Sequence, residues 1–155
     1  MEEQTILLVE DDFLNRRLCR KVLVDNAYRV LEAKNATEAK SILNKEKIEL
    51  AILDINLGEG ERSGITIGQE LAKQYGVPFL YLTAYDSPEI INRAIATTPY
   101  AYVTKPFKNT DLLTSVALAI RQGVKPNREI LSIVVKDGEF NVDLPLADMY
   151  RPEKS

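Results

Sequence analysis

The sequence predicts an α/β protein in which a five-stranded parallel sheet is covered by helices on both faces. Five short segments read as strands, and those at residues 5–9 and 50–53 are unbroken apolar runs without helical spacing or alternation, as expected for strands that are buried on both faces of a parallel sheet. Each of the five is followed by a segment in which apolar residues recur with helical periodicity. Because parallel strands are joined by right-handed crossovers, this alternation places the helices on both faces.

The elements follow one another in regular order along the chain. The strands are expected at residues 5–9, 28–33, 48–53, 78–83 and 100–104. The helices are expected at residues 13–24, 35–45, 65–75, 87–97 and 111–122. Asp12 is predicted to cap the first helix, Asn35 with Glu38 resembles a capping box at the second, and Asn109 or Thr110 is predicted to cap the last.

The composition excludes several classes of protein. The chain has 155 residues, enough for one domain with a short extension, and an ordinary soluble balance of 45% hydrophobic and 28% charged residues. No apolar run approaches the roughly 20 residues of a membrane span. The net charge of −3, with scattered basic residues, argues against a nucleic-acid surface.

Cysteine and histidine content narrows the chemistry further. The single cysteine, Cys19, cannot form an internal disulfide, and the N-terminal residues MEEQ do not resemble a signal peptide, so a cytoplasmic location is expected. The chain has no histidine, which excludes His-based catalysis and His metal ligands. Carboxylates must therefore hold any metal ion.

Polar residues stand where the apolar runs end. Glu10 and Asp11 follow the first strand, Asp54 the third, Thr83 closes the fourth, and Lys105 follows the fifth. Ligands of open α/β sheets bind beyond the carboxyl ends of the strands, so these side chains are expected to converge in one crevice. Taken alone, Asp54 would more often be a loop carboxylate that caps the next helix.

The combination of residues suggests a phosphoryl-transfer chemistry. Asp11, Asp54 and a main-chain carbonyl just after Asp54 would give the oxygen-rich site that Mg²⁺ favours, and the cation would offset the repulsion between carboxylates. A carboxylate can attack a phosphoryl group while Mg²⁺ and Lys105 neutralise its oxygens. Thr83 would donate a hydrogen bond to the transferred group.

Four segments resemble the receiver domain of two-component response regulators, a CheY-like family: LLVED, LDINL, YLTA and YVTKPF, within residues 5–122. The resemblance implies a flavodoxin-like fold with strand order 2-1-3-4-5. It also implies that Asp54 accepts a phosphoryl group from a histidine kinase or phosphotransfer protein, and that the chain is a signalling domain with no external substrate to turn over.

The same resemblance assigns roles to the other residues of the crevice. Asp11 matches the direct Mg²⁺ ligand, Glu10 the acidic residue that acts mainly through water, and Asn56 the residue that offers its main-chain carbonyl. Thr83 matches the switch hydroxyl and Lys105 the ammonium that faces the phosphate. The family usually has a cis bond before the matching proline, so Lys105-Pro106 is a candidate.

Tyr102 matches the family's switch aromatic, which turns inward when Thr83 moves toward the phosphoryl group. The alternative is a half-exposed aromatic on an edge strand. In the family, the fourth helix, fifth strand and fifth helix form the usual face for a homodimer or an output partner.

Two other functions remain as alternatives. A phosphohydrolase that uses an aspartyl phosphate would need a second carboxylate at position 56, where the chain has asparagine. A binding module that keeps the fold without phosphorylation would be expected to lack part of the site, yet Asp11, Asp54, Thr83 and Lys105 are all present.

The receiver pattern covers residues 1–123 and leaves residues 124–155 as a linker and tail. Residues 130–136 and 140–146 read as two strands around an Asp137-Gly138 turn, which predicts a β-hairpin. The tail weakly resembles the opening hairpin of the LytTR DNA-binding family, and would then be a truncated effector domain. The alternative, with equal weight, is a simple hairpin that packs on the receiver or pairs between subunits.

Overall fold

The computed structural model describes residues 3–58, 60, 63–123, 132–136 and 139–143. These residues form one sheet whose strands are β1 (Thr5–Val9), β2 (Arg29–Ala33), β3 (Leu50–Leu53), β4 (Phe79–Thr83), β5 (Ala101–Thr104), β6 (Ser132–Lys136) and β7 (Glu139–Asp143). The helices are α1 (Phe13–Asp25), α2 (Ala36–Lys45), α3 (Gly64–Glu70), a π-helical turn (Leu71–Tyr75), α4 (Pro88–Ile95) and α5 (Asn109–Gly123).

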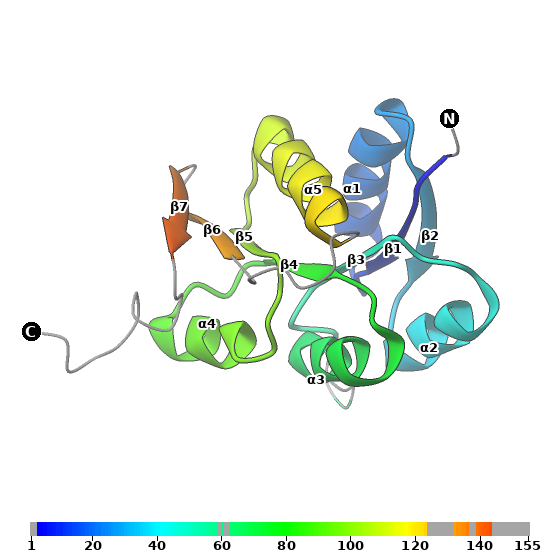
Figure 1. Cartoon of the computed structure of the whole chain (residues 1–155), viewed down its shortest axis with the longest axis horizontal. Helices are drawn as coiled ribbons and strands as arrows, with labels where there is room; N and C mark the ends of the chain where they lie inside the picture. The colour runs from blue at the N-terminus through cyan, green and yellow to red at the C-terminus, as the bar shows by residue number, and fades with distance from the viewer. Residues whose placement is uncertain (1–2, 59, 61–62, 124–131, 137–138, 144–155) are drawn as a thin grey trace, which may run out of the picture.

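The first five strands run parallel in the order β2-β1-β3-β4-β5, which confirms the predicted flavodoxin-like order. Helices α1 and α5 cover one face of the sheet, and α2, α3 and α4 cover the other (Figure 1). Strands β1, β3 and β4 lie inside this arrangement and are buried along their whole length. The carboxyl ends of these strands therefore meet at one edge of the layered structure.

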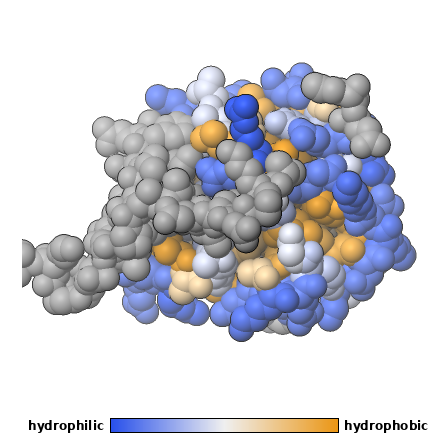
Figure 2. Space-filling view, viewed as in Figure 1, coloured by the Kyte–Doolittle hydropathy of each residue, from blue (hydrophilic) through white to orange (hydrophobic). Residues whose placement is uncertain are grey.

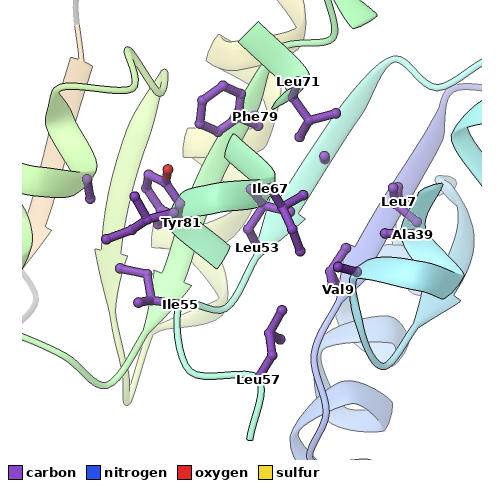
Figure 3. Packing of buried hydrophobic residues seen from close by; sticks show 14 of the residues in the cluster. Leu7, Val9, Ala39, Leu53, Ile55, Leu57, Ile67, Leu71, Phe79 and Tyr81 are labelled. Atoms are coloured by element: carbon purple, nitrogen blue, oxygen red, sulfur yellow. The ribbon is translucent and has the colours of Figure 1, made fainter. Parts of the chain in front are cut away.

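Neighbouring residues of each inner strand belong to two different cores. Leu7 and Ala51 face the core beneath α2, α3 and α4, whereas Ile6 and Ile52 face the core beneath α1 and α5. Figure 3 shows the first core, where side chains of β1, β3 and β4 point toward α2 and α3. In the view of Figure 2, hydrophilic residues make up most of the outline of the coloured surface, and hydrophobic residues are visible between them.

The predicted caps of the first two helices are confirmed. The Asp12 carboxylate accepts a hydrogen bond from the Asn15 amide at 2.8 Å, at the start of α1. The Asn35 side chain accepts from the Glu38 amide at 2.9 Å, and Glu38 in turn accepts from the Lys34 amide at 2.9 Å. The exchange resembles a capping box, with the returning bond one residue earlier than usual.

The last helix begins earlier than predicted. It starts at Asn109, and the Leu112 amide donates to the Lys108 carbonyl at 3.1 Å. Both predicted cap residues, Asn109 and Thr110, therefore lie within the first turn. Several polar residues stand side by side in this segment, and sequence pattern does not distinguish between them.

The helix predicted at residues 65–75 changes its hydrogen bonding partway along. An α-helix ends at Glu70 and a π-helical turn continues to Tyr75. Gly76 then adopts a left-handed conformation with φ +62°, and its amide donates to the Leu71 carbonyl at 2.9 Å. The predicted stop at this glycine is confirmed, because Gly adopts positive φ without strain.

The tail hairpin is part of the same sheet. Strands β6 and β7 pair antiparallel, and β6 lies parallel to β5 with Tyr102 opposite Val134. The hairpin therefore extends the five-stranded parallel sheet by main-chain pairing with β5, and β5 is an inner strand (Figure 1). The predicted Asp137-Gly138 turn and residues 124–131 and 144–155 lie outside the described residues. Within the described ranges, every helix is too short or too polar to cross a bilayer.

Candidate functional site

Three carboxylates meet where β1 and β3 end. The two strands pair so that Val9 lies opposite Leu53, and this register brings the residues that follow them together. Oxygen atoms of Glu10, Asp11 and Asp54 all lie within 4.8 Å of one another. Glu10 and Asp54 are buried whereas Asp11 is exposed, so the cluster opens to solvent on one side.

Asp54 does not cap the following helix. Ser63 caps α3 instead, and the Asp54 carboxylate accepts a hydrogen bond from the Asn56 amide at 3.2 Å. Asn56 is exposed, and its side-chain oxygen accepts from the Gly58 amide at 3.1 Å. Gly58 has φ +101°, and a Cβ there would lie 3.3 Å from an Asp11 carboxylate oxygen. The loop after β3 therefore passes close to both aspartates.

Lys105 brings a positive charge into the cluster. Its Nζ donates to the Glu10 carboxylate and, at 3.0 Å, to Asp54 Oδ2. The side chain is only 16% exposed, and burial by itself would lower the pKa of the ammonium. Glu10 and Asp54 outweigh this effect, so the pKa of Lys105 is raised and the group stays charged. The Lys105-Pro106 peptide bond is cis, as expected.

Burial has the opposite consequence for Glu10. Loss of water raises the pKa of this carboxyl from 4.5 to about 7, and the nearby Asp54 charge acts in the same direction. The hydrogen bond from Lys105 lowers the pKa but does not restore its ordinary value. Glu10 is therefore poised to gain or lose a proton near neutral pH.

Thr83 lies beside the cluster at the end of β4, and Tyr102 lies on the neighbouring strand β5. Both side chains are fully buried, and the Tyr85 amide lies 3.5 Å from Thr83 Oγ1. The Tyr102 hydroxyl donates to the Tyr85 carbonyl at 2.7 Å. Tyr102 therefore points inward rather than lying half exposed, and both residues contact the loop that joins β4 to α4.

These side chains, apart from Tyr102, line a cavity of about 430 Å³ at the carboxyl ends of the strands. Its lining includes Glu10, Asp11, Asp54, Asn56, Thr83 and Lys105. Apart from Tyr102, the predicted site residues therefore line one cavity. The three carboxylates and the main-chain carbonyls of the nearby loop offer hard oxygen donors, which are the ligands that Mg²⁺ prefers.

The profile of the response regulator receiver domain matches residues 6–117. The chain belongs to this family. Among curated relatives, the transcriptional regulatory protein PdtaR of Mycobacterium tuberculosis is 30% identical over 116 residues, which are 74% of this chain and 56% of PdtaR. The aerobic respiration control protein ArcA of Escherichia coli is 32% identical over 114 residues, 72% of this chain and 46% of ArcA. The receiver chain spans about half the length of these relatives.

Solved structures agree with the family and the fold. The receiver domain of a modulated diguanylate cyclase from Desulfovibrio desulfuricans superposes with a TM-score of 0.72 at 27% identity, covering 79% of this chain and 97% of that one. A CheY-like receiver domain from Methanospirillum hungatei gives the same TM-score at 24% identity and shows the fold. The chain is therefore a receiver of the two-component signalling class.

Two contributions to the receiver site have no simple signal in the sequence. Gly64 lies where a Cβ would be 2.1 Å from the main-chain oxygen of Asp54, so only glycine fits beside the cluster. Arg16 contacts the main chain of Glu10 and Asp11, and its Nη1 donates to the Glu10 carbonyl at 2.9 Å. Arg16 looked like one of several surface residues on an amphipathic helix, and only the folded structure distinguishes it.

The raised pKa of Glu10 predicts that Mg²⁺ binding by this receiver depends on pH. With a pKa of about 7, roughly a tenth of the molecules have an ionised Glu10 at pH 6, against roughly nine tenths at pH 8. Mg²⁺ competes with that proton, so the Mg²⁺ dissociation constant is expected to be about tenfold larger at pH 6. Calorimetric titration at both pH values measures the change. A Glu10→Gln variant should bind more weakly and lose this dependence; an unchanged dependence would rule Glu10 out as its source.

Proposed function

We propose that the chain accepts a phosphoryl group on Asp54 from a histidine kinase or phosphotransfer protein, with Mg²⁺ as the cofactor. The observation that carries the proposal is the placement of Lys105. Its ammonium bridges Glu10 and Asp54, with the Asp11 carboxylate beside them and Thr83 on the wall of the same cavity. Phosphoryl transfer needs this combination of a nucleophile and fixed positive charge.

In the proposed reaction, an Asp54 carboxylate oxygen attacks phosphorus and forms a P–O bond. The bond between phosphorus and the donor nitrogen breaks, and its electron pair leaves with the donor imidazole. Mg²⁺ held by Asp11, Asp54 and the Asn56 carbonyl, with Glu10 acting through water, would neutralise the phosphoryl oxygens. Lys105 holds a proton and a positive charge beside Asp54, and Thr83 offers a hydroxyl donor.

The chain then acts as a switch rather than as an enzyme with an external substrate. The phosphoryl group adds close to two negative charges and strong acceptors, which Thr83 and Lys105 bind in only one of two arrangements. Tyr102 reports that arrangement through its hydrogen bond to the Tyr85 carbonyl, in the loop before α4. Phosphorylation would thereby remodel the face made of α4, β5 and α5.

That face is proposed to contact a second copy or an output partner. Because β6 pairs with β5, a homodimer through this face would meet at α4 and α5 rather than at an open β5 edge. We further propose that residues 1–123 are the receiver domain and residues 124–155 a separate tail. Relatives such as PdtaR carry names of transcriptional regulators, so a cytoplasmic role in gene regulation is the proposed output.

Replacing Asp54 by asparagine tests the proposal. The amide has nearly the size of the carboxylate, so the fold is expected to persist while phosphoryl uptake is abolished. The protein is incubated with acetyl phosphate and Mg²⁺, with and without EDTA, and its intact mass is measured. The wild type should gain one phosphoryl group only when Mg²⁺ is available. Uptake at full stoichiometry by Asp54→Asn, or no uptake by the wild type, would contradict the proposal; wild-type failure together with no beryllofluoride binding favours the phosphorylation-independent binding module.

A further inference from the structure

Arg16 connects three separate parts of the receiver. Its side chain extends from α1 and is only 12% exposed. The Nη1 atom donates to the Glu10 carbonyl at 2.9 Å and approaches the Asp11 carbonyl at 3.4 Å. The Nε atom donates to Glu32 of β2 at 3.0 Å. One guanidinium therefore links α1, the end of β1 and β2.

The carbonyls that Arg16 binds belong to the residues whose carboxylates lie beside Asp54. The Glu10 amide already donates to the Ala33 carbonyl at 3.0 Å, which continues the pairing of β1 with β2. Arg16 extends this anchorage one residue further, to the exposed Asp11. The position of the Asp11 carboxylate depends on the main chain that carries it, so a bond to that main chain orients the carboxylate.

Arg16 is itself held in a fixed orientation. Glu32 accepts hydrogen bonds from Arg16, from Arg20 at 2.9 Å and from Arg17 at 3.3 Å. The Phe13 ring lies 5.6 Å from the Arg16 guanidinium and 5.7 Å from that of Arg17. Arginine can make both sets of contacts because its guanidinium is a planar fork, whereas lysine offers one ammonium.

We propose that Arg16, anchored by Glu32, is a positioning residue for the divalent-cation site of the receiver. It fixes the main chain of Glu10 and Asp11, so that both carboxylates are held in place for Mg²⁺. The inference rests on the proposed function, because it assumes that Mg²⁺ binds at this cluster. Outer residues that orient metal ligands typically change metal affinity by about 10- to 100-fold when they are replaced.

Electrostatics predicts the opposite sign, which makes the inference testable. Arg16 carries a positive charge close to the site, so its removal would strengthen Mg²⁺ binding if charge alone mattered. A positioning role predicts weaker binding instead. Arg16→Lys keeps the charge and loses the fork, and Arg16→Met loses both.

The experiment measures the Mg²⁺ dissociation constant by calorimetric titration at pH 8, for the full chain and its variants. Arg16→Lys and Arg16→Met are both expected to raise the dissociation constant about tenfold. The phosphorylation rate with acetyl phosphate should fall at low Mg²⁺ and recover at saturating Mg²⁺. Arg17→Met is the matched control. Arg17 contacts Glu32 and Phe13 as Arg16 does, but within the described residues it makes no hydrogen bond to the main chain of Glu10 or Asp11. The Mg²⁺ dissociation constant of this variant should change less than twofold.

Urea unfolding without Mg²⁺ separates positioning from stability alone. If the Arg16 variants lose stability but bind Mg²⁺ as tightly as the wild type, or more tightly, the inference is wrong and Arg16 supports only the fold. If Arg16→Met does not fold, Glu32→Gln provides the second variant and should also weaken Mg²⁺ binding. A wild type that neither binds Mg²⁺ nor takes up phosphate would overturn the proposed function as well, whereas an active wild type with unaffected variants overturns the inference alone.

Discussion

Gly64→Ala is expected to destabilise the receiver by roughly 3 kcal/mol and to slow phosphorylation of Asp54. The new Cβ would lie 2.1 Å from the Asp54 main-chain oxygen and 3.0 Å from the Cα of Ile55. Both contacts are with main chain, which cannot rotate away as a side chain can. The strand end that carries Asp54 must therefore shift. Urea unfolding gives the loss of stability, and intact mass against time gives the rate with acetyl phosphate.

Gly68→Ala is the matched control on the same helix. A Cβ there would lie 2.2 Å from the Tyr81 hydroxyl oxygen, which is hydrogen-bonded to Thr97 at 2.6 Å. This variant should lose stability too, because the buried tyrosine must move, but its phosphorylation rate should stay near that of the wild type. Equal rates for Gly64→Ala and Gly68→Ala would show that Gly64 serves packing alone.

Lys105→Met is expected to cost roughly 3 kcal/mol of stability at pH 8 in the absence of Mg²⁺. The substitution leaves Glu10 and Asp54 buried without their counter-charge. The pKa of Glu10, already raised to about 7, should rise further because the lowering effect of Lys105 is gone. When the pKa of a carboxyl group is higher in the folded state than in the unfolded state, its contribution to the free energy of unfolding is fully present at pH values below the unfolded-state pKa. That contribution is lost as pH rises through the folded-state pKa. The substitution should therefore lower the free energy of unfolding more at pH 8 than at pH 5.

Urea unfolding at pH 5 and pH 8, without and with Mg²⁺, checks this expectation. Mg²⁺ should restore much of the lost stability, since a cation then offsets the two carboxylates again. Phosphorylation by acetyl phosphate should nevertheless be slower by roughly a hundredfold, because Lys105 no longer stabilises charge on the transferred group. Equal losses of stability at both pH values would contradict the assigned role of Lys105 as the counter-charge of Glu10 and Asp54.

The alternation of strands and helices predicted the parallel sheet and the convergence of the polar cluster, whereas the strand order was implied by the resemblance to the receiver family. Asp54 and Lys105 are far apart in the chain, yet each follows a buried strand, and parallel strands of one sheet end at the same edge. Once the strands were recognised, the positions of the two residues followed. Their hydrogen bond at 3.0 Å agrees with that expectation.

Contacts between surfaces of different elements were not predictable in the same way. Arg16 is one of several basic residues of α1. Arg16 and Arg17 both donate to Glu32 of β2, and what distinguishes Arg16 is its hydrogen bonds to the Glu10 and Asp11 carbonyls. Gly64 lacks a positive φ, so nothing local demanded glycine there; the demand comes from the Asp54 carbonyl. The pairing of β6 with β5 depends on a crossover through α5, and the alternation pattern of the tail predicted a hairpin without saying where it would lie.

β2 and β5 are the first and last of the five parallel strands, and they are protected against uncontrolled strand pairing by different means. On β2, charged side chains occupy the edge region: Arg29 pairs with Glu46 at 3.2 Å, and Glu32 is held by arginines of α1. On the other side, β5 has the apolar sequence AYVT, and its main chain pairs with β6. Exposed apolar edges are sites where proteins aggregate, and charge or a covering strand prevents this. The β6–β7 hairpin therefore covers the β5 edge that carries Tyr102 and leaves β7 as the last strand on that side of the described sheet.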